Sequence, residues 1–186
     1  VSFFIPDRSK HDILLQQLSA IPGVEDLSFS SGEPGFNSSF AAFSAPDRGM
    51  NKDDVTEIKD VDERYADMFG LTMLAGEKLT RKDSADTLNQ VIVNETLIHK
   101  LGIQYPKEAI GTGFNVNGNR VTISGVLQDF QSESKHKNRR PVIIDYDANN
   151  FFRVSAALHT GHLLNTMSAI EKTWTTLFPD ALFTYE

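Results

Sequence analysis

The stretch QVIVNETLIHKLG, residues 90–102, is the one in which the local signals for secondary structure agree most completely. The run from Val91 to Val93 is β-branched and predicts a short buried strand. Asn94 follows as a natural helix N-cap, because its side-chain oxygen can accept a hydrogen bond from an orphaned backbone N–H. Positions 97, 98 and 101 then share one apolar helical face, and Gly102 can supply the left-handed residue that ends a helix. The stretch therefore predicts a strand that leads directly into a short helix.

A hairpin is expected immediately downstream. Residues 114–116 and 121–127 are rich in apolar and β-branched residues, and Asn117-Gly118 lies between them. Both turn residues tolerate positive φ, and the twist of such a turn matches that of the flanking strands. Gly125 is interpreted as a glycine at a close approach between backbones.

Taken in order, these pieces resemble the extracytoplasmic core domain of MacB-like, FtsX-type ABC transporter permeases. The residues that carry the resemblance are VIVNET (91–96), LG (101–102), IG (110–111), ISGV (123–126) and DF (129–130). Upstream, residues 65–70, LAG at 74–76 and Asp83 fit the same family, and residues 174–185 fit its closing helix and strand. The family commonly has Gly-Arg where this chain has Gly76-Glu77, so any role of that arginine is absent here.

The resemblance implies an α+β fold with two subdomains. It implies a ferredoxin-like βαβ porter subdomain formed by both chain ends and an inserted mixed α/β, sabre-like subdomain. We place the porter-like subdomain at residues 1–61 and 148–186 and the inserted subdomain at residues 62–147.

The N-terminal residues independently predict a β-α-β unit. Strands are expected at Val1–Ile5 and Val24–Ser30, with a helix from about Lys10 to Ala20 between them. Ser9 with Asp12 resembles a capping box for that helix.

A second β-α-β unit is predicted at the C-terminus. Strands are expected at 151–158 and 181–185, and Thr160 is expected to cap the helix between them. Apolar residues at 163, 167, 170, 174 and 177 fall on one narrow face of that helix. We interpret this face as core packing, with a ligand or partner site as the alternative.

Residues 31–54 are rich in Gly, Ser, Asn, Pro and Asp, and we interpret them as a long loop with one short strand near residues 40–44. This loop contains three phenylalanines, Phe36, Phe40 and Phe43. They either pack the loop against the surface of the domain or contact a partner. After the loop, residues 55–61 alternate and predict a strand, and Asp62 is expected to cap the short helix that follows.

The only basic cluster lies at residues 135–140. It contains Lys135, His136, Lys137, Arg139 and Arg140. Such a charge run is either a solvated loop or a surface for anionic lipid headgroups or an acidic partner. The candidate partner contacts are therefore Phe36, Phe40, Phe43, Lys135, Lys137, Arg139 and Arg140.

Composition excludes several classes of function. Acidic residues outnumber basic ones 25 to 18, for a net charge of −7, which argues against nucleic-acid binding. Zero cysteines exclude disulfides and thiolate metal sites. No window approaches the roughly 18 apolar residues of a membrane span, and no signal peptide is evident. Because the chain starts at Val1 and not at Met, we expect an excised fragment. The resemblance implies that the cuts lie where transmembrane helices were removed.

No catalytic pattern stands out, so the chain is expected to have no enzymatic activity, cofactor or metal. The five histidines lack metalloprotease spacing, and the pair His159 and His162 has no neighbouring carboxylate in sequence to complete a zinc site. Gly111-Thr112-Gly113 lacks the lysine and the strand-before-helix context of a phosphate loop.

The resemblance implies that the chain is the periplasmic domain of an inner-membrane ABC transporter permease. A separate ABC ATPase would act on a dimer of the parent permease, and the domain would transmit motion to export, or to handling of an adaptor or lipoprotein. The alternative function is a free-standing periplasmic module that binds a ligand or peptide. Apolar helices flanking the domain in its parent gene, beside an ATPase gene, would favour the permease.

Overall fold

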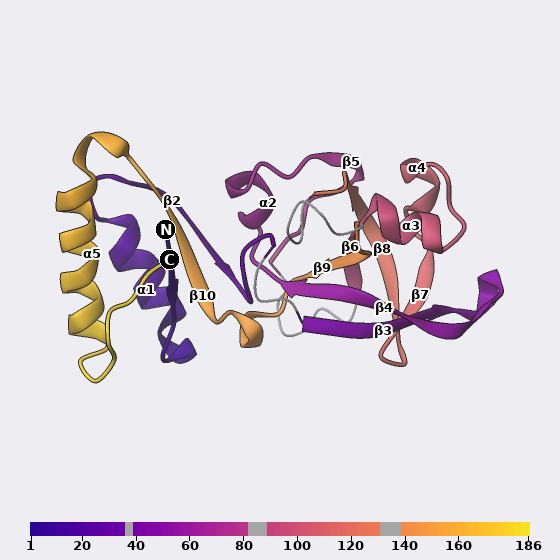
Figure 1. Cartoon of the computed structure of the whole chain (residues 1–186), viewed down its shortest axis with the longest axis horizontal. Coiled ribbons are helices and arrows are strands. Elements are labelled where there is room, and N and C mark those ends of the chain that lie inside the picture. The colour runs from indigo at the N-terminus through magenta and orange to yellow at the C-terminus, as the bar shows by residue number, and fades with distance from the viewer. Residues whose placement is uncertain (36–38, 82–88, 131–138) are drawn as a thin grey trace.

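A computed structural model describes residues 1–35, 39–81, 89–130 and 139–186, and the molecule divides into two units along its long axis (Figure 1). What we call the end unit contains β1 (Ser2–Phe4), α1 (His11–Ser19), β2 (Val24–Ser30), β10 (Arg153–Leu158) and α5 (Leu163–Leu177). What we call the barrel unit contains β3 (Ser39–Ala45), β4 (Met50–Asp60), α2 (Tyr65–Met68), β5 (Met73–Gly76), β6 (Gln90–Asn94), α3 (Glu95–Lys100), α4 (Pro106–Ala109), β7 (Gly113–Val116), β8 (Asn119–Leu127) and β9 (Val142–Asp145). The fold is therefore a mixture of sheets and helices, which agrees at this level with the α+β class that the resemblance implies.

The end unit is a three-stranded antiparallel sheet in the order β1-β10-β2. Figure 1 shows α1 and α5 on one side of this sheet, where a core that includes Phe3, Leu18, Val154 and Trp174 is buried. Both chain ends lie here, because the backbones of Ser2 and Glu186 exchange two hydrogen bonds of 3.0 and 3.1 Å.

Three local expectations for the end unit are wrong. Asp7, not Ser9, is the capping residue: it accepts from the Ser9 N–H at 3.0 Å and starts a 3₁₀ turn that precedes α1. His159 caps a similar turn before α5, so Thr160 does not start the helix. The last residues form only a single bridge, between Phe3 and Tyr185, and not a strand. At Asp7 and His159, short-range side-chain bonding offers the backbone an alternative to the regular helix start.

The seven strands of the barrel unit form one sheet, in the order β5-β8-β6-β9-β4-β3-β7, and pairing of β7 with β8 closes it on itself. β4 and β9 are parallel, as are β6 and β8, and the other pairs are antiparallel. Closure removes most of the exposed edges of the sheet.

The signals in residues 90–127 are confirmed. Asn94 caps α3, because its side-chain oxygen accepts from the Leu97 N–H at 3.2 Å. Asn117 and Gly118 have φ of 48° and 82° and join β7 to β8. Alternate residues of β6 enter different cores: Val91 and Val93 pack with one cluster, and Ile92 packs with another that includes Tyr65.

The prediction of one short strand near residues 40–44 is confirmed by β3, but the prediction that residues 50–54 belong to a loop is wrong. β3 extends from Ser39 to Ala45, and β4 begins at Met50. Ala41, Phe43 and Ala45 alternate into the barrel core, but the polar residues that follow hide the start of β4 from pattern reading. Both strands therefore belong to the sheet of the barrel unit, although the division at residue 61 groups them with the chain ends. No helix within the described residues is long and apolar enough to span a membrane.

Candidate functional site

The two units are joined by a short set of backbone hydrogen bonds between the end of β2 and the end of β4. Ser30 and Val61 form an antiparallel bridge. On either side of it, the Ser31 N–H donates to the Asp60 carbonyl at 2.7 Å and the Asp62 N–H donates to the Phe29 carbonyl at 2.9 Å. We call this set of contacts the junction. It makes the end of one sheet continuous with the end of the other.

The Asp62 carboxylate reinforces the junction. One oxygen accepts from the Ser28 hydroxyl at 2.7 Å, and the other accepts from the Phe29 N–H at 2.7 Å. The residue is only 8% exposed, and burial raises the pKa of its carboxyl above the ordinary value. Sequence reasoning expected a helix cap at Asp62. The side chain does accept from the Arg64 N–H at 3.2 Å, but its contacts with β2, more than thirty residues away, had no local signal.

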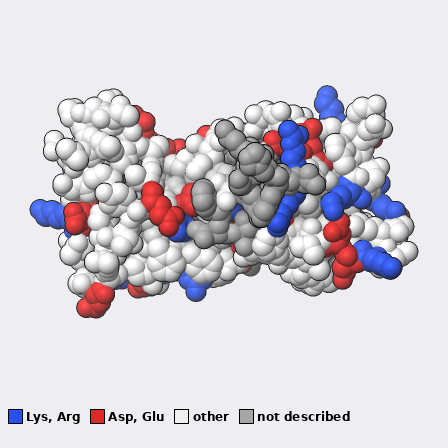
Figure 2. Space-filling model, in the orientation of Figure 1, with Lys and Arg blue, Asp and Glu red and all other residues white. Residues whose placement is uncertain are grey.

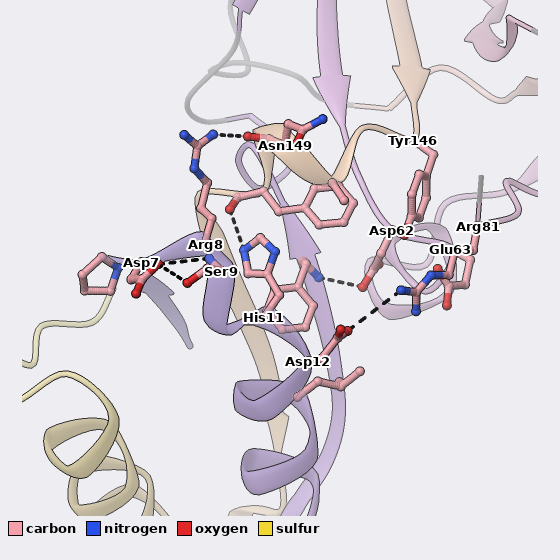
Figure 3. A pocket seen from close by; sticks show the side chains of 15 residues that line it. Asp7, Arg8, Ser9, His11, Asp12, Asp62, Glu63, Arg81, Tyr146 and Asn149 are labelled. Atoms are coloured by element: carbon pink, nitrogen blue, oxygen red, sulfur yellow. Dashed lines mark hydrogen bonds and ion pairs between the residues drawn. The ribbon is translucent and has the colours of Figure 1, made fainter. Parts of the chain in front are cut away.

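A polar cleft of about 670 Å³ opens beside the junction, between α1, the residues after β4 and the loop before β10 (Figure 3). Its inner wall is aromatic: the His11 ring lies 5.1 Å from Phe29 and 5.9 Å from Phe151. Charged groups line its rim, and the closest ion pair across it joins Arg81 to Asp12 at 3.9 Å. That pair is largely exposed, so it adds little to stability.

His11 is held in a fixed orientation within this cleft. Its Nε2–H donates to the Phe151 carbonyl at 3.0 Å, and burial lowers the pKa of the imidazole. The neutral ring therefore serves as a packing and hydrogen-bonding group of the end unit.

The predicted partner contacts have different positions. Phe40 is 51% exposed, and the Arg140 guanidinium lies 5.4 Å from the centre of its ring. A predicted phenylalanine contact therefore lies beside a residue of the predicted basic cluster. Phe43 is 0% exposed and packs edge-on against Phe114, so its place among surface contacts is wrong. The reason is strand geometry: Phe40 and Phe43 are three apart on β3 and so point to opposite faces.

The remaining members of the predicted set are less informative. The exposed Arg139 side chain lies 3.5 Å from the buried Asp129 carboxylate. Phe36, Lys135 and Lys137 lie outside the described residues. On the face shown in Figure 2, Lys and Arg side chains gather mainly over the barrel unit.

The motif residues Asn94, Thr96 and Asp129 form one hydrogen-bonded network. Asp129 accepts from the Asn94 side chain at 2.8 Å, from the Thr96 N–H at 2.9 Å and from the Thr96 hydroxyl at 2.8 Å. Asn94 also accepts from the Val142 N–H at 2.9 Å and donates to the Arg140 carbonyl at 2.8 Å. The network therefore fixes the start of α3, the end of β8 and the start of β9. Its role is structural.

A buried ion pair lies on β4. The Lys59 ammonium is 3.4 Å from the Glu57 carboxylate, and both side chains are fully buried. Burial lowers the pKa of Lys59, and the nearby Glu57 charge opposes that effect. The alternation in residues 55–61 predicts a strand but does not show which of its faces is buried, so the sequence did not indicate this ion pair.

Metal chemistry finds no support in the part of the chain that the structure describes, where no three potential ligands from His, Asp and Glu are grouped around a common point. His159 caps the turn before α5 by accepting from the Gly161 N–H at 3.1 Å, and its ring centre lies 6.3 Å from that of His162. The features described above are therefore a junction, a cleft and an exposed aromatic-basic pair.

The chain matches the model of one protein family and is similar to several solved structures. The model of the family described as the MacB-like periplasmic core domain matches residues 6–173. The periplasmic region of MacB from Actinobacillus actinomycetemcomitans has a TM-score of 0.68 at 16% identity, and the match covers 98% of this chain and 86% of that one. The extracellular domain of the noncanonic ABC-type transporter YknZ from Gram-positive bacteria has a TM-score of 0.67 at 13% identity, with 99% and 98% covered. No curated protein matches the chain. At these identities the structural likeness shows the fold.

Proposed function

The chain belongs to the family of MacB-like periplasmic core domains, which are extracytoplasmic parts of ABC transporter permeases, and we propose that it relays ATP-driven motion to a partner outside the membrane. In this role the chain performs no chemistry of its own. The energy comes from the ATPase of the transporter, which acts on a parent permease that we propose to be dimeric.

The observation that carries this proposal is the position of the two chain ends. Ser2 and Glu186 are bonded to each other in the end unit (Figure 1), so displacements arriving through either end act on the same three-stranded sheet. The junction then couples that sheet to the barrel unit. A rigid unit at the ends and a second unit beyond it suit rigid-body or hinge motion.

We propose that the end unit corresponds to the ferredoxin-like porter subdomain and the barrel unit to the inserted sabre-like subdomain. Sheet membership supports a division near residues 31 and 147, because β3 and β4 pair only within the barrel unit. This division assigns residues 32–61 differently from the division based on resemblance.

We also propose that Phe40, Arg139 and Arg140 contact the partner, which would be a periplasmic adaptor or a lipoprotein. Phe40 and Val55 are more than half exposed and line a shallow pocket with these arginines. An exposed aromatic ring beside guanidinium groups is typical of residues that dominate protein interfaces.

The relay is tested in the full-length permease, reconstituted with its ATPase in nanodiscs. Spin labels at Leu164→Cys in the end unit and Asn51→Cys in the barrel unit sit at exposed positions, and this domain contains no cysteine. We expect the distance between the barrel units of two permease copies to change with nucleotide state. Asp62→Ala should reduce that change while ATP hydrolysis continues. Barrel units that keep one separation in every nucleotide state would overturn the proposal.

Partner contact is tested by affinity capture of envelope proteins from the source organism. Capture of an adaptor or lipoprotein should be lost with Phe40→Ser. The matched control is Tyr105→Ser, because Tyr105 is another aromatic residue of the barrel unit that is more than half exposed. Equal loss in both variants would contradict the assignment of this surface.

A further inference from the structure

A second cavity, of about 710 Å³, lies on the opposite side of the end-unit sheet from α1 and α5. Side chains alternate along β10, so Val154 and Ala156 enter the helix-covered core while Ser155 and Ala157 face the cavity. Met68 and Phe69, at the end of α2, provide an apolar wall. The volume is in the range of cavities that hold small organic molecules.

The Ser155 hydroxyl is a polar group in the wall of this cavity. Ser155 is 5% exposed, and its hydroxyl has no hydrogen-bond partner among the described residues. A buried hydroxyl without a partner costs free energy, so a hydrogen-bonding group in the cavity would relieve that cost. Ser2 lies directly opposite Ser155 in the β1–β10 ladder.

The charges around the cavity do not balance. The Arg153 guanidinium is shared by two carboxylates: its Nε lies 3.2 Å from Glu33 and its Nη2 lies 2.8 Å from Glu186. One negative charge is therefore left over.

Glu33 keeps its charge at neutral pH. Burial alone would raise the pKa of this carboxyl, but hydrogen bonding from Ser2 and the nearby Arg153 lower it overall. Through Ser2, Glu33 is close to the Ser155 hydroxyl, so a charged acceptor and a neutral acceptor lie near each other at one end of an apolar wall.

We propose that this cavity binds a protonated primary amine with an apolar substituent, its ammonium group between Glu33 and Ser155 and its apolar part along Met68 and Phe69. An ammonium donates up to three hydrogen bonds and accepts none, which fits a carboxylate and a free hydroxyl. A carboxylic acid of the same shape would place like charges together. The proposal goes beyond the mechanical relay and does not depend on it.

The proposal is tested by NMR titration of the isotope-labelled chain with three probes of the same chain length: n-octylammonium, n-octanol and octanoate. We expect n-octylammonium to shift the amide signals of Ser155, Met68 and Phe69, and to bind about tenfold more tightly than octanoate because only its charge is complementary. Octanol should fall between them. Equal affinity for all three probes, shifts confined to other residues, or no saturable shift would each overturn the proposal.

Variants then test separately how the charge and the shape of the cavity contribute to binding. Glu33→Gln should weaken n-octylammonium several-fold and leave octanol unchanged, whereas Glu108→Gln, an exposed carboxylate on α4, should change neither. Ala157→Leu should block all three probes by filling the cavity without altering its charge. If Glu33→Gln does not fold, the Ala157→Leu result decides alone, and binding that survives it overturns the proposal.

Discussion

Asp62 contributes a buried acceptor to two donors of β2, and its protonation state makes this contribution depend on pH. Burial raises the pKa of its carboxyl in the fold above the value of about 3.9 in an unfolded chain. The fold therefore binds the proton more tightly than the unfolded chain does. It follows that the stability from this group is complete below the unfolded pKa and is lost as pH rises through the folded pKa.

This loss of stability with rising pH gives a prediction for Asp62→Asn. The asparagine retains one acceptor oxygen but places an N–H₂ group near the Ser28 hydroxyl or the Phe29 N–H, so the variant should be less stable than the parent chain by about 1–3 kcal/mol. The difference should be larger near pH 3 than near pH 7, since only the parent loses stability as its carboxyl ionises. Denaturant unfolding at a series of pH values measures it, and a difference that grows toward neutral pH would contradict the assignment.

Asn94 is the other residue whose side chain joins distant segments. It accepts from Leu97 and Val142 and donates to Asp129 and the Arg140 carbonyl. Because Asn94→Ala leaves several buried groups without partners, we expect it to lower the free energy of unfolding by about 2–4 kcal/mol.

The control for Asn94 is Asn51→Ala, an exposed asparagine on β4. Urea unfolding compares the two variants, and the control should stay within about 0.5 kcal/mol of the parent. A similar small effect for both would mean that the network around Asn94 is not important for stability.

At the scale of single elements, two glycines of the β7–β8 hairpin should behave differently when changed to alanine. Gly118 has a φ of 82° and open space where a Cβ would lie, so Gly118→Ala should cost about 1 kcal/mol from backbone strain alone. At Gly125 a Cβ would lie 2.6 Å from the Glu77 carbonyl oxygen and 2.7 Å from Met73 Cε. Since β5 or β8 must move to admit it, Gly125→Ala should cost about 2–3 kcal/mol. Thermal unfolding of both variants tests this order, and the reverse order would contradict the close approach.

Elements whose signals are local could be predicted from the sequence. The Asn94 cap, the Asn117-Gly118 turn and the close approach at Gly125 all depend on residues near in sequence or on backbone rules, and the structure confirms them. The short strand near residues 40–44 was predicted too, but its place in a closed sheet and the start of β4 at Met50 were not, because pairing of β3 with β4 and β7 leaves no local pattern in the sequence.

The candidate site was less predictable than the fold for the same reason. Partner contact by Phe40 was one of two alternatives and stays a prediction. The structure adds that its ring is 51% exposed and lies beside Arg140, a contact between segments a hundred residues apart. The buried role of Asp62 depends on β2, and an aspartate after a strand equally suggests a helix cap.

At the scale of the whole molecule, the barrel unit is an insertion into the end unit. β2 leaves the end-unit sheet at Ser30, and β10 returns to it at Arg153, and these two residues are direct partners in the antiparallel ladder. The chain between them supplies the barrel unit. The sheet face that looks away from the helices carries Ser2, Ser28 and Ser155, so it contains small polar residues that can be exposed to water without a large cost.

This arrangement predicts that the end unit folds without the barrel unit. Residues 32–151 are replaced by Asn-Gly, which suits a two-residue turn between antiparallel strands and would join β2 directly to β10. The product keeps the core around Phe3, Leu18 and Trp174 but loses Phe151 and Tyr146 from its edge. We expect cooperative unfolding, measured by the fluorescence of Trp174, the only tryptophan. The stability should be lower than that of the full chain, because a unit of roughly 70 residues buries a smaller fraction of its surface.

Leu18→Asp in the same short chain is the control that should abolish the transition. If the short chain shows no transition while the full chain folds, the end unit needs the barrel unit for its stability, and the division into two subdomains has no basis in independent folding.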